Sequence, residues 1–179
     1  MASDVALARA GSSTPLEART FFDSDGSPFI IRPLRPDDHS ALRAFYDQFE
    51  PKRRAHGLPP AKPERIETWL LSILEQGVHL VLERDGLIGH AFVTPTDREG
   101  VCEYAVFLHQ DFRGKGIGTQ LNFAMIEAAR ISGVRRLWLT VEPRNKAALR
   151  SYVKVGFKYV PETRFSIEPE MELSLESTH

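Results

Sequence analysis

The amino-acid sequence predicts an α/β protein with a β-rich first half, then a βαβα segment and closing strands. Apolar runs on either side of Asp85-Gly86 predict an antiparallel hairpin, because this residue pair suits a tight turn between strands. A glycine-rich turn joins the apolar strand 101–108 to a helical pattern. The strand 136–141 is also followed by a helical pattern, so strands and helices alternate in this half.

The N-terminal segment divides into a tail and the start of the domain. Residues 1–19 show no sustained period and carry small and breaker residues, so we expect a flexible tail followed by a single domain over residues 20–179. Residues 20–26 and 28–33 then predict two short strands around an Asp-Gly turn.

Two helices are expected next. The first begins at Pro36, with acidic residues in its first turn. The second begins at Pro63 and ends at Gly77, and the proline-containing segment 50–62 between them predicts a loop. Helical spacing places these apolar residues on the buried faces: Leu42, Phe45, Tyr46, Phe49, Ile66, Trp69, Leu70, Ile73 and Leu74.

The second half continues this alternation. Residues 78–82 and 87–93 form the hairpin, and residues 101–108 add a third antiparallel strand. The helix after the glycine turn buries Leu121, Ala124, Met125 and Ala128.

Beyond that helix, Leu137, Leu139 and Val141 alternate as a further strand. Asn145 caps a helix that ends at Gly156. Residues 158–160 and 171–175 give the last strands.

Composition excludes several classes of protein. The 23 basic and 24 acidic residues among 179 leave no basic excess for binding nucleic acid by bulk charge. No apolar run reaches the roughly 20 residues of a membrane span, and no secretion signal opens the chain. Cys102 is the single cysteine and excludes internal disulfides. We therefore expect a cytoplasmic protein that binds neither membrane nor nucleic acid.

The turn at residues 113–118 (Arg-Gly-Lys-Gly-Ile-Gly) is built to hold a phosphate. Glycines let the backbone bend so that several N–H groups point at one anion from the positive end of the following helix. The spacing excludes a P-loop, which needs four residues between its first glycine and Gly-Lys-Ser/Thr. It also excludes a dinucleotide fingerprint, whose third glycine would fall at Thr119.

The same turn matches the R/Q-x-x-G-x-G/A pyrophosphate signature of the GCN5-related N-acetyltransferases (GNAT). A second segment, residues 136–157, resembles that family's strand 5, its Asn-x-x-Ala-x-x-x-Tyr helix and its closing Gly-Phe. The resemblance covers about residues 28 to 175 and implies the GNAT fold: a mixed, strongly twisted sheet with helices on both faces, in which strands 4 and 5 splay apart. It further implies that acetyl-coenzyme A is the cosubstrate and lies in that gap.

The resemblance assigns roles to particular residues. Asn145 and the main chain around the end of strand 4 and the glycine turn would bind the cofactor, with the N–H of Leu108 facing the thioester oxygen. The cofactor-binding set is Val106, Phe107, Leu108, Arg113, Gly114, Lys115, Gly116, Ile117, Gly118, Thr119 and Asn145. The side chains of Arg113 and Lys115 reach the phosphates or point to solvent.

Two side chains are expected to carry the proton transfers. Tyr152 lies seven residues after Asn145, so about two helical turns place both on one face, and the family uses a tyrosine here to protonate the coenzyme A thiolate. Its alternative is a core aromatic residue. Glu103 is the expected general base, because some relatives carry a catalytic glutamate at the matching position of strand 4. Other relatives carry a glutamate five positions before the Asn145 position, but this chain has Thr140 there. Solvation at a strand end is the alternative for Glu103; Glu142 and His90 are weaker substitutes.

The sequence leaves the acceptor open between a protein lysine and a small primary amine. The segment opening at Ile31 and the Glu103 strand resemble bacterial and archaeal protein-lysine acetyltransferases, and acidic residues such as Glu162, Glu168 and Glu170 would favour polycations. No histidine has metal-ligand spacing, so no metal is expected. Cys102 is interpreted as a core residue, which favours direct transfer over an acyl-cysteine. The alternative function is a coenzyme A-binding sensor, and homodimerisation is common in the family.

Overall fold

The computed structural model describes residues 17–52 and 58–176 of the chain. Its helices, including three short 3-10 helices, are η1 (Pro36–Asp38), α1 (His39–Gln48), α2 (Pro63–Leu74), η2 (Gln110–Phe112), α3 (Ile117–Ile131), α4 (Lys146–Lys154) and η3 (Pro161–Thr163). Its strands are β1 (Arg19–Phe22), β2 (Pro28–Pro33), β3 (Val78–Glu83), β4 (Leu87–Pro95), β5 (Val101–Leu108), β6 (Arg136–Thr140), β7 (Lys158–Tyr159) and β8 (Glu170–Ser174). Arg19, which the sequence assigned to the tail, is thus the first residue of β1; residues 1–16 of that predicted tail lie outside the described residues.

Within the described residues the strands form one twisted sheet in the order β1-β2-β3-β4-β5-β6-β8-β7. The pairing is antiparallel except between β5 and β6, which are parallel. The predicted hairpin forms at Asp85-Gly86, where Asp85 has φ 53°. The expectation of a mixed sheet is therefore confirmed.

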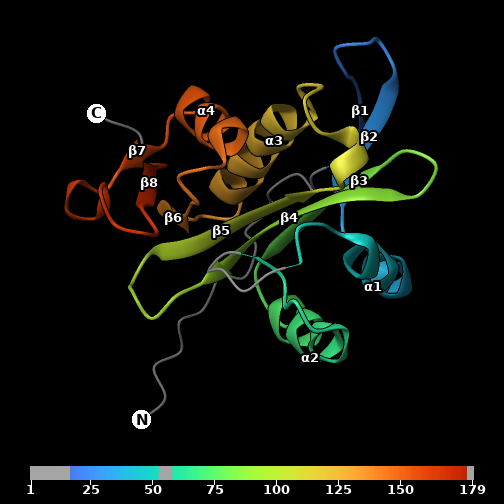
Figure 1. Ribbon diagram of the computed structural model, residues 1–179, viewed down its shortest axis with the longest axis horizontal. Coiled ribbons are helices and arrows are strands. Elements are labelled where there is room, and N and C mark those ends of the chain that lie inside the picture. Colours follow the sequence, from blue (N-terminus) through green and yellow to red (C-terminus); the bar gives the residue numbers. More distant parts are fainter. Residues whose placement is uncertain (1–16, 53–57, 177–179) are drawn as a thin grey trace.

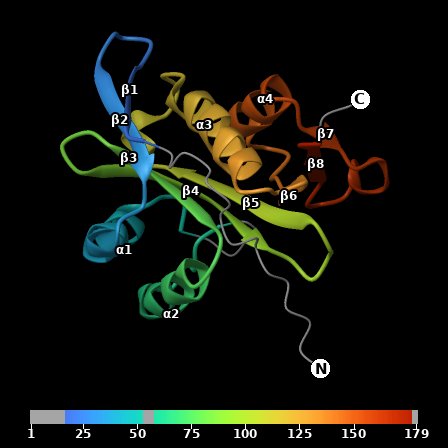
Figure 2. The same cartoon turned by 180° about the vertical axis from the view of Figure 1, so that it is seen from behind.

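Helices cover both faces of this sheet (Figures 1 and 2). On one face α3 and α4 enclose a core in which Leu121, Met125 and Leu137 are fully buried. On the other face α1 and α2 enclose a second core built around Tyr46, Leu70 and other residues of the predicted stripes. Central strands such as β4 can bury both of their faces because their side chains alternate between the two cores.

A buried ion pair fixes the start of α1 against the sheet. Arg32 on β2 donates to both carboxylate oxygens of Asp38, at 2.7 and 2.8 Å, and its Nε donates to Glu83 at 2.7 Å. Asp38 also accepts the main-chain N–H of Arg35. Because α1 leads directly into the loop beside the site described below, this anchor sets where that loop begins.

In the described part of the chain, no helix is long and apolar enough to cross a membrane. Within the same residues, no group of three or more His, Cys, Asp or Glu side chains is placed to hold a metal ion.

Candidate functional site

A gap opens between β5 and β6 in the middle of the sheet. The register pairs Val101 to Glu103 with Arg136 to Trp138, and the pairing between the two strands stops there. Residues 104–108 of β5 continue alongside β4 instead. The family's strands 4 and 5 correspond to β5 and β6 of this structure, so the splay that the resemblance implied is confirmed.

Main-chain groups of β5 point into this gap. The N–H of His109 donates to the carbonyl of Ile88 on β4, whereas the carbonyl of Gly100 accepts from Arg136 at the start of β6. Because main-chain groups alternate in direction along a strand, even-numbered residues of β5 face β6 and odd-numbered ones face β4. The main-chain groups of Val106 and Leu108 are therefore turned toward the gap, whereas those of Phe107, which the resemblance also assigned to the cofactor, face β4.

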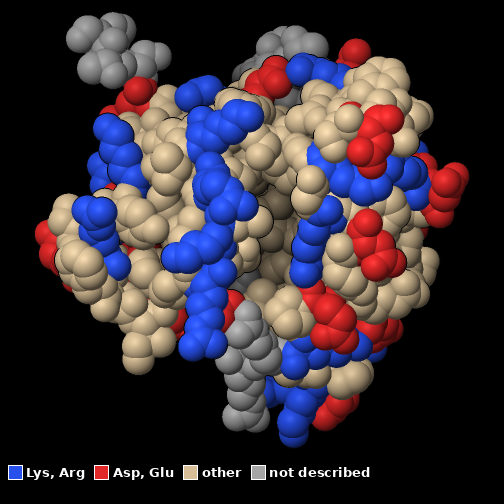
Figure 3. Space-filling model, turned by 45° about the horizontal axis from the view of Figure 1, so that its top comes forward, with Lys and Arg blue, Asp and Glu red and all other residues tan. Residues whose placement is uncertain are grey.

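A cavity of about 590 Å³ occupies the gap and its surroundings. Figure 3 shows a hollow in the surface with Lys and Arg side chains on both sides. The lining comes from the α1–α2 loop, the end of β5, the glycine turn, α3, the end of β6 and α4. Its residues are Phe49, Pro51, Leu58, Val106, Phe107, Leu108, Arg113, Gly114, Gly116, Gly118, Thr119, Asn122, Thr140, Val141, Glu142, Arg144, Asn145, Ala147, Ala148, Arg150, Ser151, Tyr152 and Lys154.

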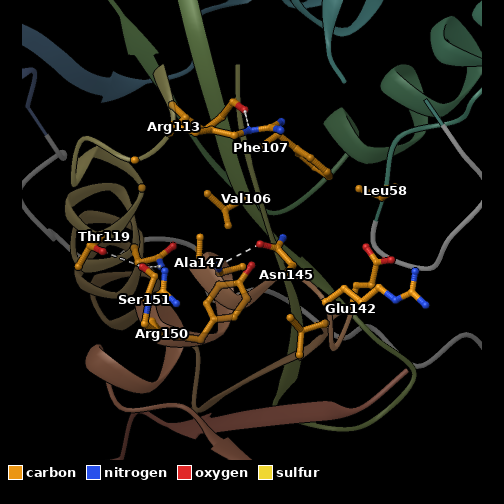
Figure 4. A pocket seen from close by; sticks show the side chains of 18 of the residues that line it. Leu58, Val106, Phe107, Arg113, Thr119, Glu142, Asn145, Ala147, Arg150 and Ser151 are labelled. Carbon is orange, nitrogen blue, oxygen red and sulfur yellow. Dashed lines mark hydrogen bonds between the residues drawn. The ribbon is translucent and has the colours of Figure 1, made fainter. Parts of the chain in front are cut away.

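The cavity has two ends. In Figure 4, Thr119, Ser151 and Arg150 lie on one side, and Leu58 and Glu142 lie on the opposite side. The first end adjoins the glycine turn and the second adjoins the α1–α2 loop.

The glycine turn has the predicted backbone. Gly114 has φ 78° and Gly116 has φ 76°, which is the left-handed region where side chains are strained. Gly116 occupies the N-cap position of α3. Because it has no side chain, it cannot accept a hydrogen bond from the first main-chain N–H groups of the helix. The first N–H groups of α3 are thereby available to an anion at the positive end of the helix. Ile117, by contrast, is fully buried in the core, so its contribution to a ligand is confined to its main chain.

The two cations of the turn are held by neighbouring elements. Lys115 forms an ion pair of 3.0 Å with Asp25 of the β1–β2 hairpin and is absent from the described lining. Arg113 lines the cavity, but its Nε donates to the carbonyl of Leu108 at 3.0 Å and its Nη2 donates to the carbonyl of Glu50. In this structure the turn therefore offers main-chain groups for phosphate binding, while other basic side chains lie nearby on α4.

A polar network that the sequence analysis missed joins α3, α4 and β5 beneath the cavity. Ser151 lies 2.9 Å from the Thr119 hydroxyl and accepts from the Asn122 side-chain amide at 2.8 Å. Asn122 in turn accepts a hydrogen bond from the Tyr104 hydroxyl. The available signal was a polar asparagine on the otherwise apolar face of α3, because a buried polar group needs partners.

Asn145 and Tyr152 both line the cavity, as expected from their spacing. Asn145 caps α4, accepting the N–H of Ala148 at 3.1 Å. Tyr152 is buried against Tyr104 and Phe157, with ring centroids 6.2 and 5.7 Å away. Burial raises the pKa of Tyr152, so its hydroxyl stays protonated at neutral pH and can act as a proton donor.

The structure separates the two glutamates considered as bases. Within the described residues, Glu142 belongs to the lining of the cavity and Glu103 does not. Glu103 is half-buried on β5, between Thr94 of β4 and Trp138 of β6, on the same face as Phe107. His90, the other substitute, is fully buried beneath α1 and bonded to Tyr46.

Cys102 points into the core on the α3 side of the sheet. Burial raises the pKa of its thiol, which disfavours the nucleophilic thiolate. This placement agrees with the interpretation of Cys102 as a core residue.

The fold agrees with comparisons to known proteins. Residues 40–157 match the profile of the acetyltransferase (GNAT) family, so the chain belongs to that family and is an acetyltransferase. An acetyltransferase of Pseudomonas aeruginosa is 27% identical over 142 residues, covering 74% of this chain and 76% of the relative. The L-methionine sulfoximine/L-methionine sulfone acetyltransferase of the same species is 37% identical over 59 residues, covering 33% of this chain and 34% of that protein.

Solved structures show the same fold. The GNAT domain of S. lividans PAT superimposes with a TM-score of 0.74 at 18% identity, covering 88% of this chain and 96% of that chain. The protein yncA from Salmonella typhimurium, whose structure contains its cofactor acetyl-CoA, gives a TM-score of 0.67 at 22% identity, covering 86% of this chain and 97% of that chain.

Proposed function

We propose that this acetyltransferase moves an acetyl group from acetyl-coenzyme A to a primary amine, by direct attack within a ternary complex. The observation that carries the proposal is the continuous cavity from the uncapped start of α3 to the α1–α2 loop, passing the main-chain groups of β5 that face the gap. In this proposal the phosphates of the cofactor lie at the α3 end of the cavity and the acceptor lies at the end next to the α1–α2 loop. The buried Cys102 favours direct transfer over an acyl-enzyme intermediate.

The cofactor would be held mainly by main-chain groups. The N–H groups around Gly116, Gly118 and Thr119 suit the pyrophosphate, and Arg150 and Lys154 on α4 supply positive charge near the same end of the cavity. The pantetheine arm would run along β5, pairing with Val106 and Leu108 as a further strand would. Asn145 lies close enough to line this path.

The chemistry requires a polarised carbonyl and a proton donor. The N–H of Leu108 faces the gap and would stabilise the negative charge that develops on the thioester oxygen. The Tyr152 hydroxyl, held neutral by burial, would protonate the departing thiolate.

The acceptor ammonium must lose a proton before it attacks, and we assign this step to Glu103 acting through water. Glu103 lies on the same face of β5 as Phe107, which lines the cavity. A short chain of water molecules would therefore have to connect Glu103 to the acceptor amine in the cavity. Glu142 is the second candidate, because it lines the cavity directly at the end next to Leu58.

The acceptor end combines apolar and acidic groups. Phe49, Pro51 and Leu58 provide an apolar wall, and Glu142 provides a carboxylate. Glu170 on β8 lies beside β6 and accepts a hydrogen bond from Trp138 at 2.7 Å, but among the described residues it is not part of the cavity lining. An alkylammonium group, such as a lysine side chain or a small aliphatic amine, fits this combination of an apolar wall with negative charge.

The test is a calorimetric titration with acetyl-coenzyme A, followed by a thiol-release screen of the same sample against polyamines, amino acids, aminoglycosides and lysine peptides. We expect binding together with thiol release that depends on one class of amine. Binding without release on any amine would contradict the enzymatic proposal and favour a coenzyme A sensor. Absence of binding would contradict both.

A further inference from the structure

The connection between β5 and α3 is hydrogen-bonded to the start of the α1–α2 loop, although the two segments lie about 60 residues apart in the sequence. Gln110 accepts the main-chain N–H of Glu50 at 3.1 Å and donates to the main-chain carbonyl of Gln48 at 2.9 Å. A main-chain N–H can only donate and a carbonyl can only accept, so the orientation of the Gln110 amide is determined.

Arg113 contacts the same loop residues. Its Nη2 donates to the carbonyl of Glu50, and its guanidinium lies over the ring of Phe49, 5.2 Å from the centroid. Gln110 and Arg113 thus hold three consecutive residues, Gln48 to Glu50, at the point where α1 ends and the apolar wall of the cavity begins.

The same guanidinium also contacts the end of β5. The Arg113 Nε donates to the carbonyl of Leu108 at 3.0 Å, and the N–H of this same residue faces the gap. A planar guanidinium has donors in fixed directions, so binding two carbonyls at once sets the distance between them. A lysine ammonium has no such fixed fork.

We propose that Arg113 and Gln110 are positioning residues that hold the acceptor wall at a set distance from the carbonyl-polarising N–H of Leu108. This role replaces the phosphate contact expected for the Arg113 side chain from the sequence. It rests on the proposed function for the identity of the acceptor end, but the contacts themselves can be tested without an acceptor. Loss of either residue should therefore loosen residues 48–51 and impair use of the amine, while the affinity for acetyl-coenzyme A stays nearly constant.

Two variants separate this role from phosphate binding. Gln110→Leu keeps the volume of the side chain and removes both of its hydrogen bonds to the loop. Arg113→Lys keeps the positive charge and removes the two-carbonyl fork. The matched control is Arg150→Met, which removes a cation from the phosphate end of the cavity and leaves the loop contacts in place.

The first readout is hydrogen exchange of the peptide covering residues 46–52 in the full-length protein without ligand. We expect at least fivefold faster exchange at Glu50 in Gln110→Leu and Arg113→Lys, since each loses hydrogen bonds of ordinary strength, and no change in Arg150→Met. Unchanged exchange in both loop variants would overturn the proposal, whether or not the protein proves to be an N-acetyltransferase.

The second readout is the KM for the amine found by the thiol-release screen, together with the affinity for acetyl-coenzyme A. Both loop variants should raise the KM for the amine about fivefold to tenfold, with acetyl-coenzyme A affinity within about twofold of the wild type. Arg150→Met should show the reverse pattern. A tenfold loss of acetyl-coenzyme A affinity in Arg113→Lys with an unchanged KM for the amine would assign Arg113 to the phosphates instead.

Discussion

Single side chains in or near the cavity carry the proposed proton transfers, and Tyr152 is the clearest case. Its side chain is buried and its pKa is raised, so in the proposed reaction it would meet the departing thiolate as a neutral donor. Tyr152→Phe should leave acetyl-coenzyme A affinity within about twofold and lower kcat by about 100-fold, the lower range for a general acid. Steady-state kinetics and calorimetry check this, and an unchanged kcat would restrict Tyr152 to packing against Tyr104 and Phe157.

The choice of base also belongs to the residue scale. Glu103→Gln should lower turnover most strongly below the pKa of the acceptor amine, where a proton must be removed, by about 100-fold. Glu142→Gln is the matched variant, because it removes a carboxylate that lines the cavity directly. The pH profiles of kcat/KM decide between them: a selective loss at low pH in Glu142→Gln, with equal loss at all pH values in Glu103→Gln, would transfer the role to Glu142.

At the scale of elements, the start of α3 depends on the left-handed conformation of Gly116. A Cβ at this position would meet open space, so the cost of Gly116→Ala is backbone strain of about 1–2 kcal/mol rather than a clash. Relief of the strain would turn N–H groups away from the phosphate site, and we expect at least a tenfold loss of acetyl-coenzyme A affinity by calorimetry.

Gly26 provides the control for this prediction. It lies in the β1–β2 hairpin with φ 77° and also has open space around its Cβ position. Gly26→Ala should cost similar stability in urea denaturation without a comparable loss of affinity. Equal losses of affinity in both variants would mean that Gly116 acts through global stability.

At the scale of the whole molecule, a partly buried chain of hydrogen bonds links α1 to the sheet, and we expect it to make stability depend on pH. His79 Nε2 must donate to the carbonyl of Gln76 at 3.1 Å, so its Nδ1 accepts from His90 Nε2 at 3.1 Å. His90 Nδ1 then accepts from the Tyr46 hydroxyl at 2.6 Å. This arrangement requires both imidazoles to be neutral.

Burial lowers the pKa of His79 and of His90 below the ordinary value near 6.5. Below about pH 6.5 the unfolded chain therefore binds more protons than the folded one. The contribution of these two histidines to stability is fully present above that pH and declines as the pH falls. We expect the free energy of unfolding to fall by up to about 1.4 kcal/mol per pH unit for each histidine between pH 6.5 and 5. Urea denaturation at pH 7.5 and 5.5 measures this, and His79→Gln should flatten the dependence; an equally steep decline in the variant would place the effect elsewhere.

The sequence determined the elements and the glycine turn, because these depend on local chemistry. Alternation and helical spacing predicted the strands and helices, and the glycines at 114 and 116 predicted a turn that only residues without Cβ form easily. The seven-residue spacing from Asn145 to Tyr152 placed both on the cavity because a helix keeps that period.

The tertiary structure decided which groups meet across the sheet, because these contacts join segments far apart in the chain. The gap depends on where pairing between β5 and β6 stops, and no local pattern encodes that point. Arg113 appeared in the sequence as a phosphate ligand beside its glycines, whereas its carbonyl partners on Leu108 and Glu50 became visible only once the α1–α2 loop was placed next to β5. A long flexible side chain takes its partner from its surroundings, so the sequence specified the turn and the fold specified what its arginine holds.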